Sequence, residues 1–294
     1  MTRNRRQTAL TRRSVLRRGL TLAAVTPLAM TERPATARAA PSADLWPRWL
    51  AHEPASIATI DHSDWDRLVG AYTTVGEDGI ARFAYAPCLA TRADRGALAA
   101  YIARLAQIPI SSHARAEQRP YWFNLYNALT VAVILDHYPV ASIRDIDISP
   151  GLFADGPWGR PLITVEGETL SLGDIEHRIL RPIWADPRIH YGVNCAALGC
   201  PNLQSRAFTA ANCDRLLDEA AVAFVNHPRG ARVERERLRV SSIYVWFEDD
   251  FGGTDKKVIA HLRDHARPPL VTALAGVERV ADHDYDWSLN DMSA

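Results

Sequence analysis

Residues Tyr121–Asp136, which read YWFNLYNALTVAVILD, decide the fold of this chain. On a 3.6-residue period one face of this stretch is apolar, and most of the remaining circumference is apolar as well. That face consists of Trp122, Leu125, Tyr126, Leu129 and Val133. Pro120 suits the first position of a helix, where the backbone donor that proline lacks is not needed. We therefore predict a buried central helix that starts at Pro120.

Two amides, Asn124 and Asn127, interrupt this apolar surface and lie three residues apart, so they are neighbours on one helix face. A buried amide without partners costs roughly 1–3 kcal/mol, so both side chains need hydrogen bonds. They either tie down neighbouring loops or orient a catalytic or ligand-binding group, and the sequence leaves both interpretations open.

The first residues of the chain indicate export. Residues 11–17, TRRSVLR, resemble a twin-arginine export signal. An apolar run at 20–30 follows, too short to span a bilayer, and then the small-residue pattern Ala37-Arg38-Ala39. We predict a signal peptide at 1–39, a flexible lead-in at 40–60 and one domain at 61–294. The mature protein would be periplasmic or secreted from a bacterium, with the twin-arginine export machinery as a partner.

The charge of the chain and the motifs that it lacks argue against several classes of function. The full chain has a formal charge of zero, and residues 1–39 carry nine Arg and one Glu, so the mature part is net acidic. An acidic protein without a basic patch is not expected to bind nucleic acid. No apolar run in the mature chain is long enough to span a membrane. No Gly-rich phosphate loop, GxSxG elbow or HExxH helix is present, so we expect no cofactor.

The remaining patterns mix helices and strands without a regular alternation, which favours the α+β class: one mixed domain with a small, largely antiparallel sheet. We expect Ser171 and Asp174 to form a capping pair at the start of a helix, and Thr209 to cap another. The expected helices lie at residues 64–72, 94–107, 172–180, 210–226, 243–249 and 256–265. The expected hairpins lie at 162–172 and 231–241, and further extended segments lie at 189–195 and 277–284.

Six spaced motifs resemble the DUF547 family, a domain of unknown function, from about residue 60 to the C-terminus. They are WFNLYN at 122–127, YPVASI at 138–143, LGDIEH at 172–177, IHYGVNCAALGCP at 189–201, WFEDDF at 246–251 and YDWSLN at 285–290. The resemblance implies a domain name and no established activity.

Residues 189–201 hold most of the chemistry-bearing side chains. We interpret 189–195 as a buried strand, which would place Cys195 at its accessible end. In a first interpretation Cys195 is a thiolate nucleophile, with His190 or His177 as base and an Asn or Glu that orients the imidazole. Such a site would catalyse acyl transfer or amide hydrolysis. The order of residues differs from papain-like enzymes, where the cysteine precedes the histidine and starts a helix.

Two other interpretations compete with it. Cys195 and Cys200 are close enough for a disulfide in an oxidising compartment, with Cys88 and Cys213 left over. A metal site from His190, Cys195 and Cys200 would have the spacing H-x4-C-x4-C, which is not a usual zinc pattern, so we predict none.

We expect one pocket to collect the candidate residues Asn124, Asn127, Glu176, His177, His190 and Cys195. The preferred function is a thiol-dependent hydrolase or acyltransferase that acts on a small-molecule or peptide substrate. The alternative is a non-catalytic ligand-binding or scaffold domain, in which the Asn, Glu and His side chains are structural and Cys195 is bonded to Cys200. The acidic run Glu248–Asp250 is interpreted as a solvated helix end.

Overall fold

The computed structural model describes residues 41–151 and 156–292, and all of them belong to one compact unit. The predicted signal peptide at 1–39 lies outside the described residues.

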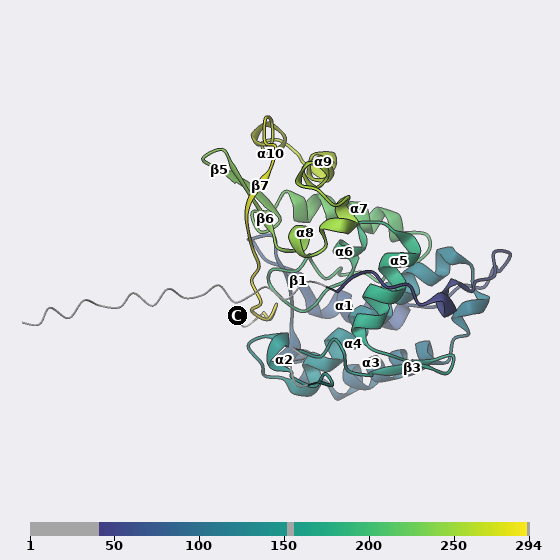
Figure 1. Ribbon diagram of the computed structural model, residues 1–294. Helices are drawn as coiled ribbons and strands as arrows, with labels where there is room; N and C mark the ends of the chain where they lie inside the picture. The colour runs from purple at the N-terminus through teal and green to yellow at the C-terminus, as the bar shows by residue number, and fades with distance from the viewer. Residues whose placement is uncertain (1–40, 152–155, 293–294) are drawn as a thin grey trace, which may run out of the picture. The chain divides into compact units, whose positions relative to one another are not determined.

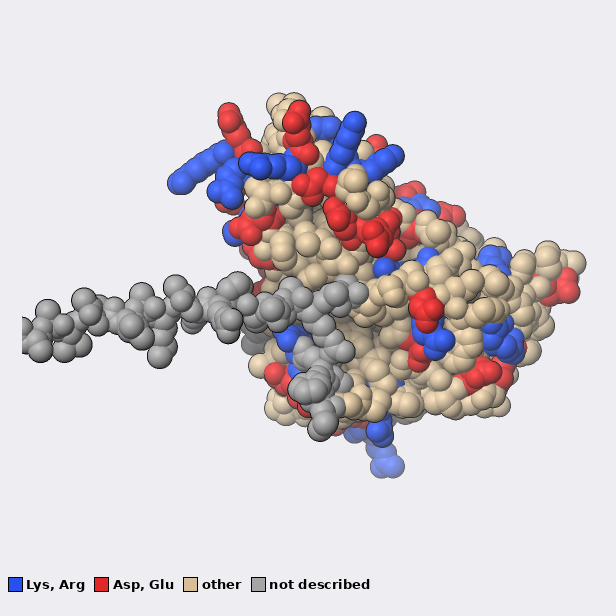
Figure 2. Space-filling model, viewed as in Figure 1, with Lys and Arg blue, Asp and Glu red and all other residues tan. Residues whose placement is uncertain are grey.

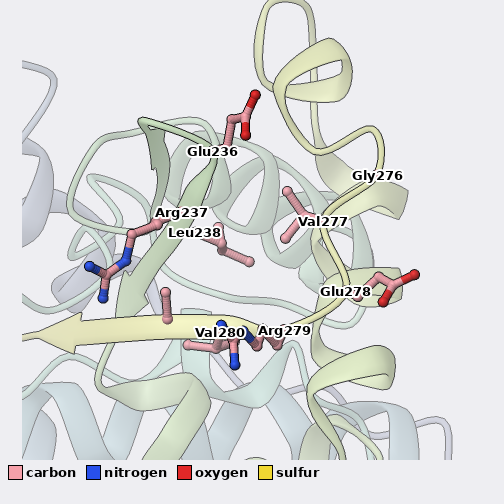
Figure 3. A pocket seen from close by; sticks show the side chains of 9 residues that line it. Glu236, Arg237, Leu238, Gly276, Val277, Glu278, Arg279 and Val280 are labelled. Carbon is pink, nitrogen blue, oxygen red and sulfur yellow. The ribbon is translucent and has the colours of Figure 1, made fainter.

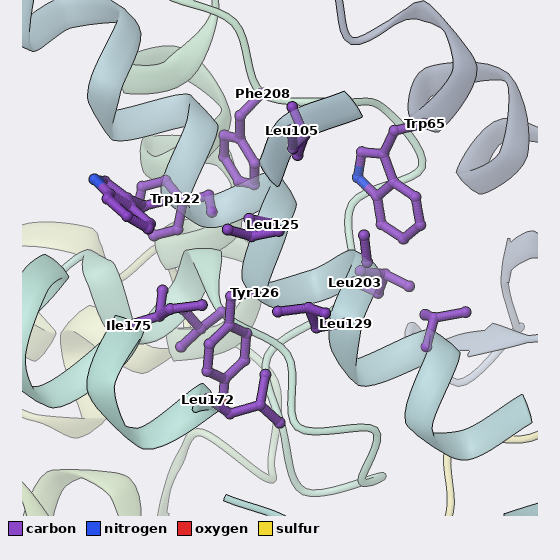
Figure 4. Packing of buried hydrophobic residues seen from close by; sticks show 14 of the residues in the cluster. Trp65, Leu105, Trp122, Leu125, Tyr126, Leu129, Leu172, Ile175, Leu203 and Phe208 are labelled. Carbon is purple, nitrogen blue, oxygen red and sulfur yellow. The ribbon is translucent and has the colours of Figure 1, made fainter. Parts of the chain in front are cut away.

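Helix α4, Arg115–His137, lies at the centre of the larger hydrophobic core. Trp122, Leu125, Tyr126 and Leu129 are buried against side chains from several other elements, as Figure 4 shows. The predicted buried helix is therefore present. Its predicted start was wrong by five residues, because residues 115–119 are mostly polar and give no apolar period, and Pro120 lies inside the helix.

The N-terminal part of the unit packs around α4 mainly through helices. Helix α1 packs on α3, and α3 packs on α4. Strands β1 and β2 form an antiparallel pair. The elements are η1 (Pro47–Leu50), α1 (Ser63–Tyr72), β1 (Thr73–Val75), β2 (Ala81–Phe83), α2 (Tyr85–Ala90), α3 (Arg92–Ala106) and η2 (Ile110–Ser112).

Residues 41–60, for which we predicted a flexible lead-in, make defined contacts. The backbone N–H groups of Asp44 and Trp46 each donate over 3.0 Å, to the carbonyls of His177 and Arg178. Trp49 is buried, and its ring centroid lies 5.0 Å from that of Trp122. This segment therefore reaches the helix that carries Glu176 and His177.

The middle of the chain contains a confirmed hairpin and a long, partly π-helical segment. Its elements are η3 (Ile143–Asp145), β3 (Ile163–Val165), β4 (Glu168–Leu170), the π-helix η4 (Asp174–Leu180) and α5 (Arg181–Trp184). Strands β3 and β4 are antiparallel. The predicted capping pair forms reciprocally: Ser171 N–H donates to Asp174 Oδ2 over 3.0 Å, and Asp174 N–H donates to Ser171 Oγ over 3.1 Å.

The strand predicted at 189–195 is wrong: Ile189–Gly192 forms a single helical turn, α6, and the chain becomes extended at Val193. A helix-start signal precedes it, because Asp186 Oδ1 accepts from Arg188 N–H over 2.9 Å and Pro187 follows Asp186. A short apolar run does not distinguish a buried strand from a buried helical turn. The helix-start signal therefore favours the helical turn. Cys195 still lies in a loop.

The C-terminal part forms a second core cluster. Its elements are α7 (Cys213–Val225), β5 (Ala231–Glu234), β6 (Arg237–Ser241), α8 (Ile243–Trp246), η5 (Glu248–Phe251), α9 (Asp255–His265), α10 (Leu270–Ala273) and β7 (Val280–Asp284). The sheet order is β5-β6-β7, with β5 antiparallel and β7 parallel to β6. Helix α7 starts later than predicted, after a turn in which Asn212 Oδ1 accepts from Thr209 N–H over 2.7 Å.

These elements confirm a single α+β domain with small sheets. Figure 1 shows β5, β6 and β7 together with α9 and α10 at one end of the unit, and α2 and α3 at the other. On the face shown in Figure 2, acidic and basic side chains intermingle at the end that carries this sheet. No helix within 41–151 or 156–292 has the length and apolarity needed to cross a membrane.

Candidate functional site

The π-helix η4 brings two of the predicted site residues and one arginine to the same place. Wider hydrogen bonding marks this segment, since Arg181 N–H donates to the Glu176 carbonyl five residues earlier. Glu176 and Arg181 are buried, and His177 is half-buried. A π-helical segment inside a longer helix often occurs at a functional site.

Asp250 connects this helix to His190. Asp250 Oδ2 accepts from Arg181 Nε over 2.5 Å and lies 2.7 Å from His190 Nε2. Burial acts to raise the pKa of the Asp250 carboxyl, but hydrogen bonds from His190 and Arg181 outweigh it and lower that pKa to about 2. Since a carboxylate can only accept, Nε2 of His190 donates this hydrogen bond.

Glu176 lies between the two predicted histidines. Its Oε1 is 3.9 Å from Nδ1 of His190 and 3.9 Å from Nδ1 of His177. Its other oxygen, Oε2, accepts from the Tyr126 hydroxyl over 3.0 Å. The central helix α4 therefore holds the carboxylate that faces both imidazoles.

The two imidazoles are not equivalent. Nδ1 of His177 lies 3.1 Å from Nη1 of Arg181, which can only donate, so this nitrogen accepts a hydrogen bond. Burial lowers the pKa of His177, and the charge of Arg181 acts in the same direction. His177 is thus a neutral imidazole with its lone pair engaged, whereas Nδ1 of His190 makes no such bond within the described residues.

Aromatic rings cover this polar cluster. Phe247 stacks on His190, with ring centroids 4.4 Å apart, and the guanidinium of Arg181 lies 4.6 Å from the same Phe247 ring. Phe251 packs against His190 at 5.5 Å. These rings limit the access of water, so the charges of Arg181 and Asp250 act on His190 with little screening.

Cys195 is partly exposed, whereas Cys88, Cys200 and Cys213 are buried. Its Sγ lies 3.0 Å from the Tyr285 hydroxyl and 3.3 Å from Sγ of Cys200. Its backbone N–H also donates to Cys200 Sγ over 3.1 Å. No histidine within the described residues is hydrogen-bonded to the Cys195 thiol, so the predicted thiol–imidazole bond is not present in this arrangement.

The two thiols differ in acidity. Burial acts to raise the pKa of Cys200, but donation from the thiol and the backbone N–H of Cys195 reverses the effect and lowers it. The hydrogen bond to Cys200, followed by burial, raises the pKa of Cys195, and the charge of Glu176 adds to this. The pair therefore loses its first proton from Cys200 and retains the second on Cys195.

The two predicted amides both tie down backbone. Asn127 donates to the Gly192 carbonyl over 2.9 Å and accepts from Asn194 N–H over 2.8 Å, so it fixes the segment that leads into Cys195. Asn124 likewise forms two hydrogen bonds with the backbone of Phe208: it donates to the carbonyl over 2.7 Å and accepts from the N–H over 3.0 Å. Asn127 therefore positions the segment before Cys195, while Asn124 positions the loop before α7.

Tyr285 belongs to a cluster of half-exposed aromatic side chains. The ring of Tyr285 lies 5.0 Å from Trp246 and 4.6 Å from Trp287, and Trp287 lies 5.8 Å from Trp158. All four rings are partly exposed. Such a surface beside a partly exposed thiol is suited to the apolar or planar part of a ligand.

The structure thus brings Glu176, His177 and His190 together, places Cys195 in a separate thiol pair and uses Asn124 elsewhere. Asp250 was missed, because an acidic run at the surface usually is a solvated helix end. Arg181 could have pointed to Asp250, since a buried guanidinium needs a carboxylate partner and Arg181 is buried. Tyr285 and Tyr126 gave no signal that separates them from packing residues.

Two other features of the described residues bear on ligand binding. Within 41–151 and 156–292, no group of three or more His, Cys, Asp or Glu side chains is arranged to hold a metal ion. A pocket of about 670 Å³ lies at the C-terminal sheet, lined by residues 236–238 and 276–281, with Leu238 and Val277 on opposite sides in Figure 3. It contains none of the candidate residues.

Residues 110–225 match the family model described as "Protein of unknown function, DUF547". The DUF547 match supports the resemblance over this segment, which includes all six predicted site residues. Asp250 and Tyr285 lie beyond the DUF547 match. No curated protein matches the chain, and no solved structure does.

Proposed function

We propose that this protein is a thiol-dependent hydrolase or acyltransferase in which Cys195 is the nucleophile and His190 moves the proton. The observation that carries the proposal is the thiol pair: the thiol of the partly exposed Cys195 donates a hydrogen bond to Cys200 Sγ over 3.3 Å. A thiolate is the nucleophilic form of cysteine, and the lowered pKa of Cys200 places the first negative charge of the pair on Cys200. The remaining proton must leave Cys195 to form the nucleophile, so the reaction needs a base.

His190 supplies the acid–base group. Asp250 fixes the imidazole through Nε2, so its Nδ1 is the nitrogen that can take up a proton. His177 is a weaker candidate because Arg181 already donates to its Nδ1. The Cys195 thiol must leave Cys200 and Tyr285 before its proton can pass to His190.

In the proposed reaction, Sγ of Cys195 attacks the carbonyl carbon of an ester, thioester or amide, and the thiol proton ends on Nδ1 of His190. The adduct then expels the leaving group, which takes the proton from His190. Water attacks the resulting thioester in a hydrolase, whereas an alcohol or amine attacks it in an acyltransferase. The half-exposed rings of Trp246, Tyr285 and Trp287 would contact the acyl group.

Acylation of the protein by p-nitrophenyl acetate tests this proposal. Trypsin releases residues 189–206 as one peptide, so mass spectrometry can locate an acetyl group on Cys195. We expect Cys195→Ala to abolish both the adduct and the nitrophenol burst, and Cys213→Ala to retain them. We expect His190→Gln to slow acylation about 100-fold, the usual scale for loss of a general acid–base.

His261→Gln is the matched control for that variant. His261 is also a half-buried imidazole with a short hydrogen bond, 2.7 Å from the Tyr191 hydroxyl, and it makes no hydrogen bond to either thiol. If both histidine variants slow acylation equally, or if Cys195→Ala reacts like the parent protein, the proposed function is wrong.

A second candidate is a non-catalytic ligand-binding or scaffold domain. The raised pKa of Cys195 and the engagement of both Asn124 and Asn127 with backbone favour it. This candidate predicts no covalent adduct on Cys195 with any acyl donor. It also predicts that Glu176→Gln and His190→Gln change stability alone.

We further propose that residues 1–39 direct export by the twin-arginine route, which the motif at 11–17 supports. Replacing Arg12 and Arg13 by lysine should leave the precursor in the bacterial cytoplasm. Fractionation of cells and determination of the N-terminus of the mature protein test this. Export of the doubly substituted chain would contradict it.

A further inference from the structure

The thiol pair offers a second chemistry that does not depend on acyl transfer. Cys195 and Cys200 are both free thiols, and their sulfurs lie 3.3 Å apart across a tight loop. Cys200 N–H donates to the Ala197 carbonyl over 3.1 Å, so a turn returns the chain toward Cys195. Cys195 is partly exposed, whereas Cys200 is buried.

We infer that Cys195 and Cys200 form a thiol–disulfide exchange site, in which Cys195 meets an organic disulfide and Cys200 resolves the mixed disulfide. This inference goes beyond the proposed function and does not require it, because it concerns the oxidation state of the two sulfurs.

The division of roles follows from access and position. An external disulfide can reach Cys195, whereas Cys200 retains only 5% of its surface exposed. Cys200 is the better resolving group, because the N–H of Cys195 donates to its sulfur over 3.1 Å and the positive charge of Arg229 favours its thiolate. An attacking thiolate close to the mixed disulfide is the requirement for fast resolution.

The exchange balances without any other reagent. Cys195 Sγ attacks one sulfur of R–S–S–R, forming Cys195–S–S–R and releasing the first R–S⁻, which takes up one of the two thiol protons. Cys200 Sγ then attacks Cys195 Sγ, and the second R–S⁻ leaves with the other proton. Two protein thiols are oxidised to one disulfide, and the external disulfide is reduced to two thiols.

Oxidised glutathione is the probe for the test. The protein is incubated with mixtures of oxidised and reduced glutathione, quenched in acid and alkylated, and the tryptic peptide of residues 189–206 is weighed. We expect a form lighter by two hydrogens that takes up no alkylating reagent, and we expect dithiothreitol to restore both alkylated cysteines.

Three variants separate the roles. Cys200→Ser should accumulate the glutathione adduct on Cys195, because no sulfur resolves it. Cys195→Ser should leave Cys200 unmodified, because the entry sulfur is missing. Cys213→Ser, with both sulfurs of the pair intact, should behave like the parent protein.

A lasting glutathione adduct on Cys195 in the parent protein would overturn the inference, and so would two free thiols at every glutathione ratio. These outcomes are independent of acyl transfer. A protein that forms the disulfide reversibly but is never acylated retains the exchange site and loses the proposed function. The reverse result retains the proposed function and removes the exchange site.

Discussion

Nε2 of His190 lies 2.7 Å from Oδ2 of Asp250, although sixty residues separate them in the chain. The same carboxylate oxygen accepts from Nε of the buried Arg181. One oxygen therefore joins three elements, α5, α6 and η5, and fixes the imidazole on which the proposed proton transfer depends. A surface acidic run thus has a role inside the molecule.

Replacing Asp250 should weaken the fold in a pH-dependent way. The lowered pKa of about 2 means that the folded state favours the ionised carboxyl, whereas an unfolded aspartate titrates near about 3.9. The stabilisation is complete above that higher value and is lost as the pH falls toward the lower one. We expect Asp250→Asn to reduce the free energy of unfolding by about 1–2 kcal/mol at pH 7, a figure lowered for solvent screening.

Urea unfolding at pH 7 and at decreasing pH, followed by intrinsic fluorescence, measures this difference. Asp249→Asn is the matched control, because Asp249 is the exposed neighbour of Asp250 in the same helical turn. A constant difference between Asp250→Asn and the parent protein at all pH values would contradict the argument.

Asn127 should affect the thiol pair more than Asn124 does, although the two amides make the same type of double hydrogen bond. Each Asn→Ala change leaves a backbone carbonyl and a backbone N–H buried without their partner, so both variants should lose about 2–4 kcal/mol. Of these two amides, Asn127 is the one that is hydrogen-bonded to the segment before Cys195. We expect the iodoacetamide alkylation rate of Cys195 to change in Asn127→Ala and to stay at the parent value in Asn124→Ala, when both are measured below their unfolding transitions.

Gly192 should tolerate no side chain. A Cβ atom there would lie 2.5 Å from Phe123 Cε1 and 2.9 Å from Leu217 Cδ2, which are both buried. Overpacking of this kind costs about 1–3 kcal/mol, so Gly192→Ala should lower the melting temperature. Gly96→Ala is the matched substitution in the exposed part of α3, where nothing lies within 4 Å of the new Cβ. It should stabilise by about 0.5–1 kcal/mol, since alanine favours a helix. Calorimetry of both variants tests this, and equal melting temperatures would contradict it.

Local patterns predicted the local structure well. The apolar period identified α4, the Ser171–Asp174 pair marked a helix start, and the hairpin at residues 231–241 formed as expected. The strand at 189–195 failed because four buried residues do not reveal their period. The partners in the site could not be predicted in the same way, because they depend on tertiary contacts between distant segments. Tyr285, for example, reaches Cys195 across ninety residues, and no local pattern records that distance.

The four cysteines should react in a fixed order, which tests the environment of the thiol pair directly. Burial raises the pKa of Cys88 to about 11 and that of Cys213 to about 12, so these thiols should label only after unfolding. Cys195 should label first in the native protein, because it is the partly exposed one. Iodoacetamide labelling read by mass spectrometry at each cysteine gives the order.

Tyr285 should increase the rate at which iodoacetamide labels Cys195. Its hydroxyl lies 3.0 Å from Cys195 Sγ and, as a donor, lowers the pKa of that thiol. Removing the donor in Tyr285→Phe raises the apparent pKa, so labelling at pH 8 should slow by about 3–10-fold, which corresponds to roughly half to one pKa unit. Tyr244→Phe is the matched control, since the Tyr244 hydroxyl lies 3.0 Å from that of Tyr191 and makes no hydrogen bond to either thiol. Faster labelling in Tyr285→Phe would show that the ring shields the sulfur more than its hydroxyl activates it, and the electrostatic argument would then be wrong.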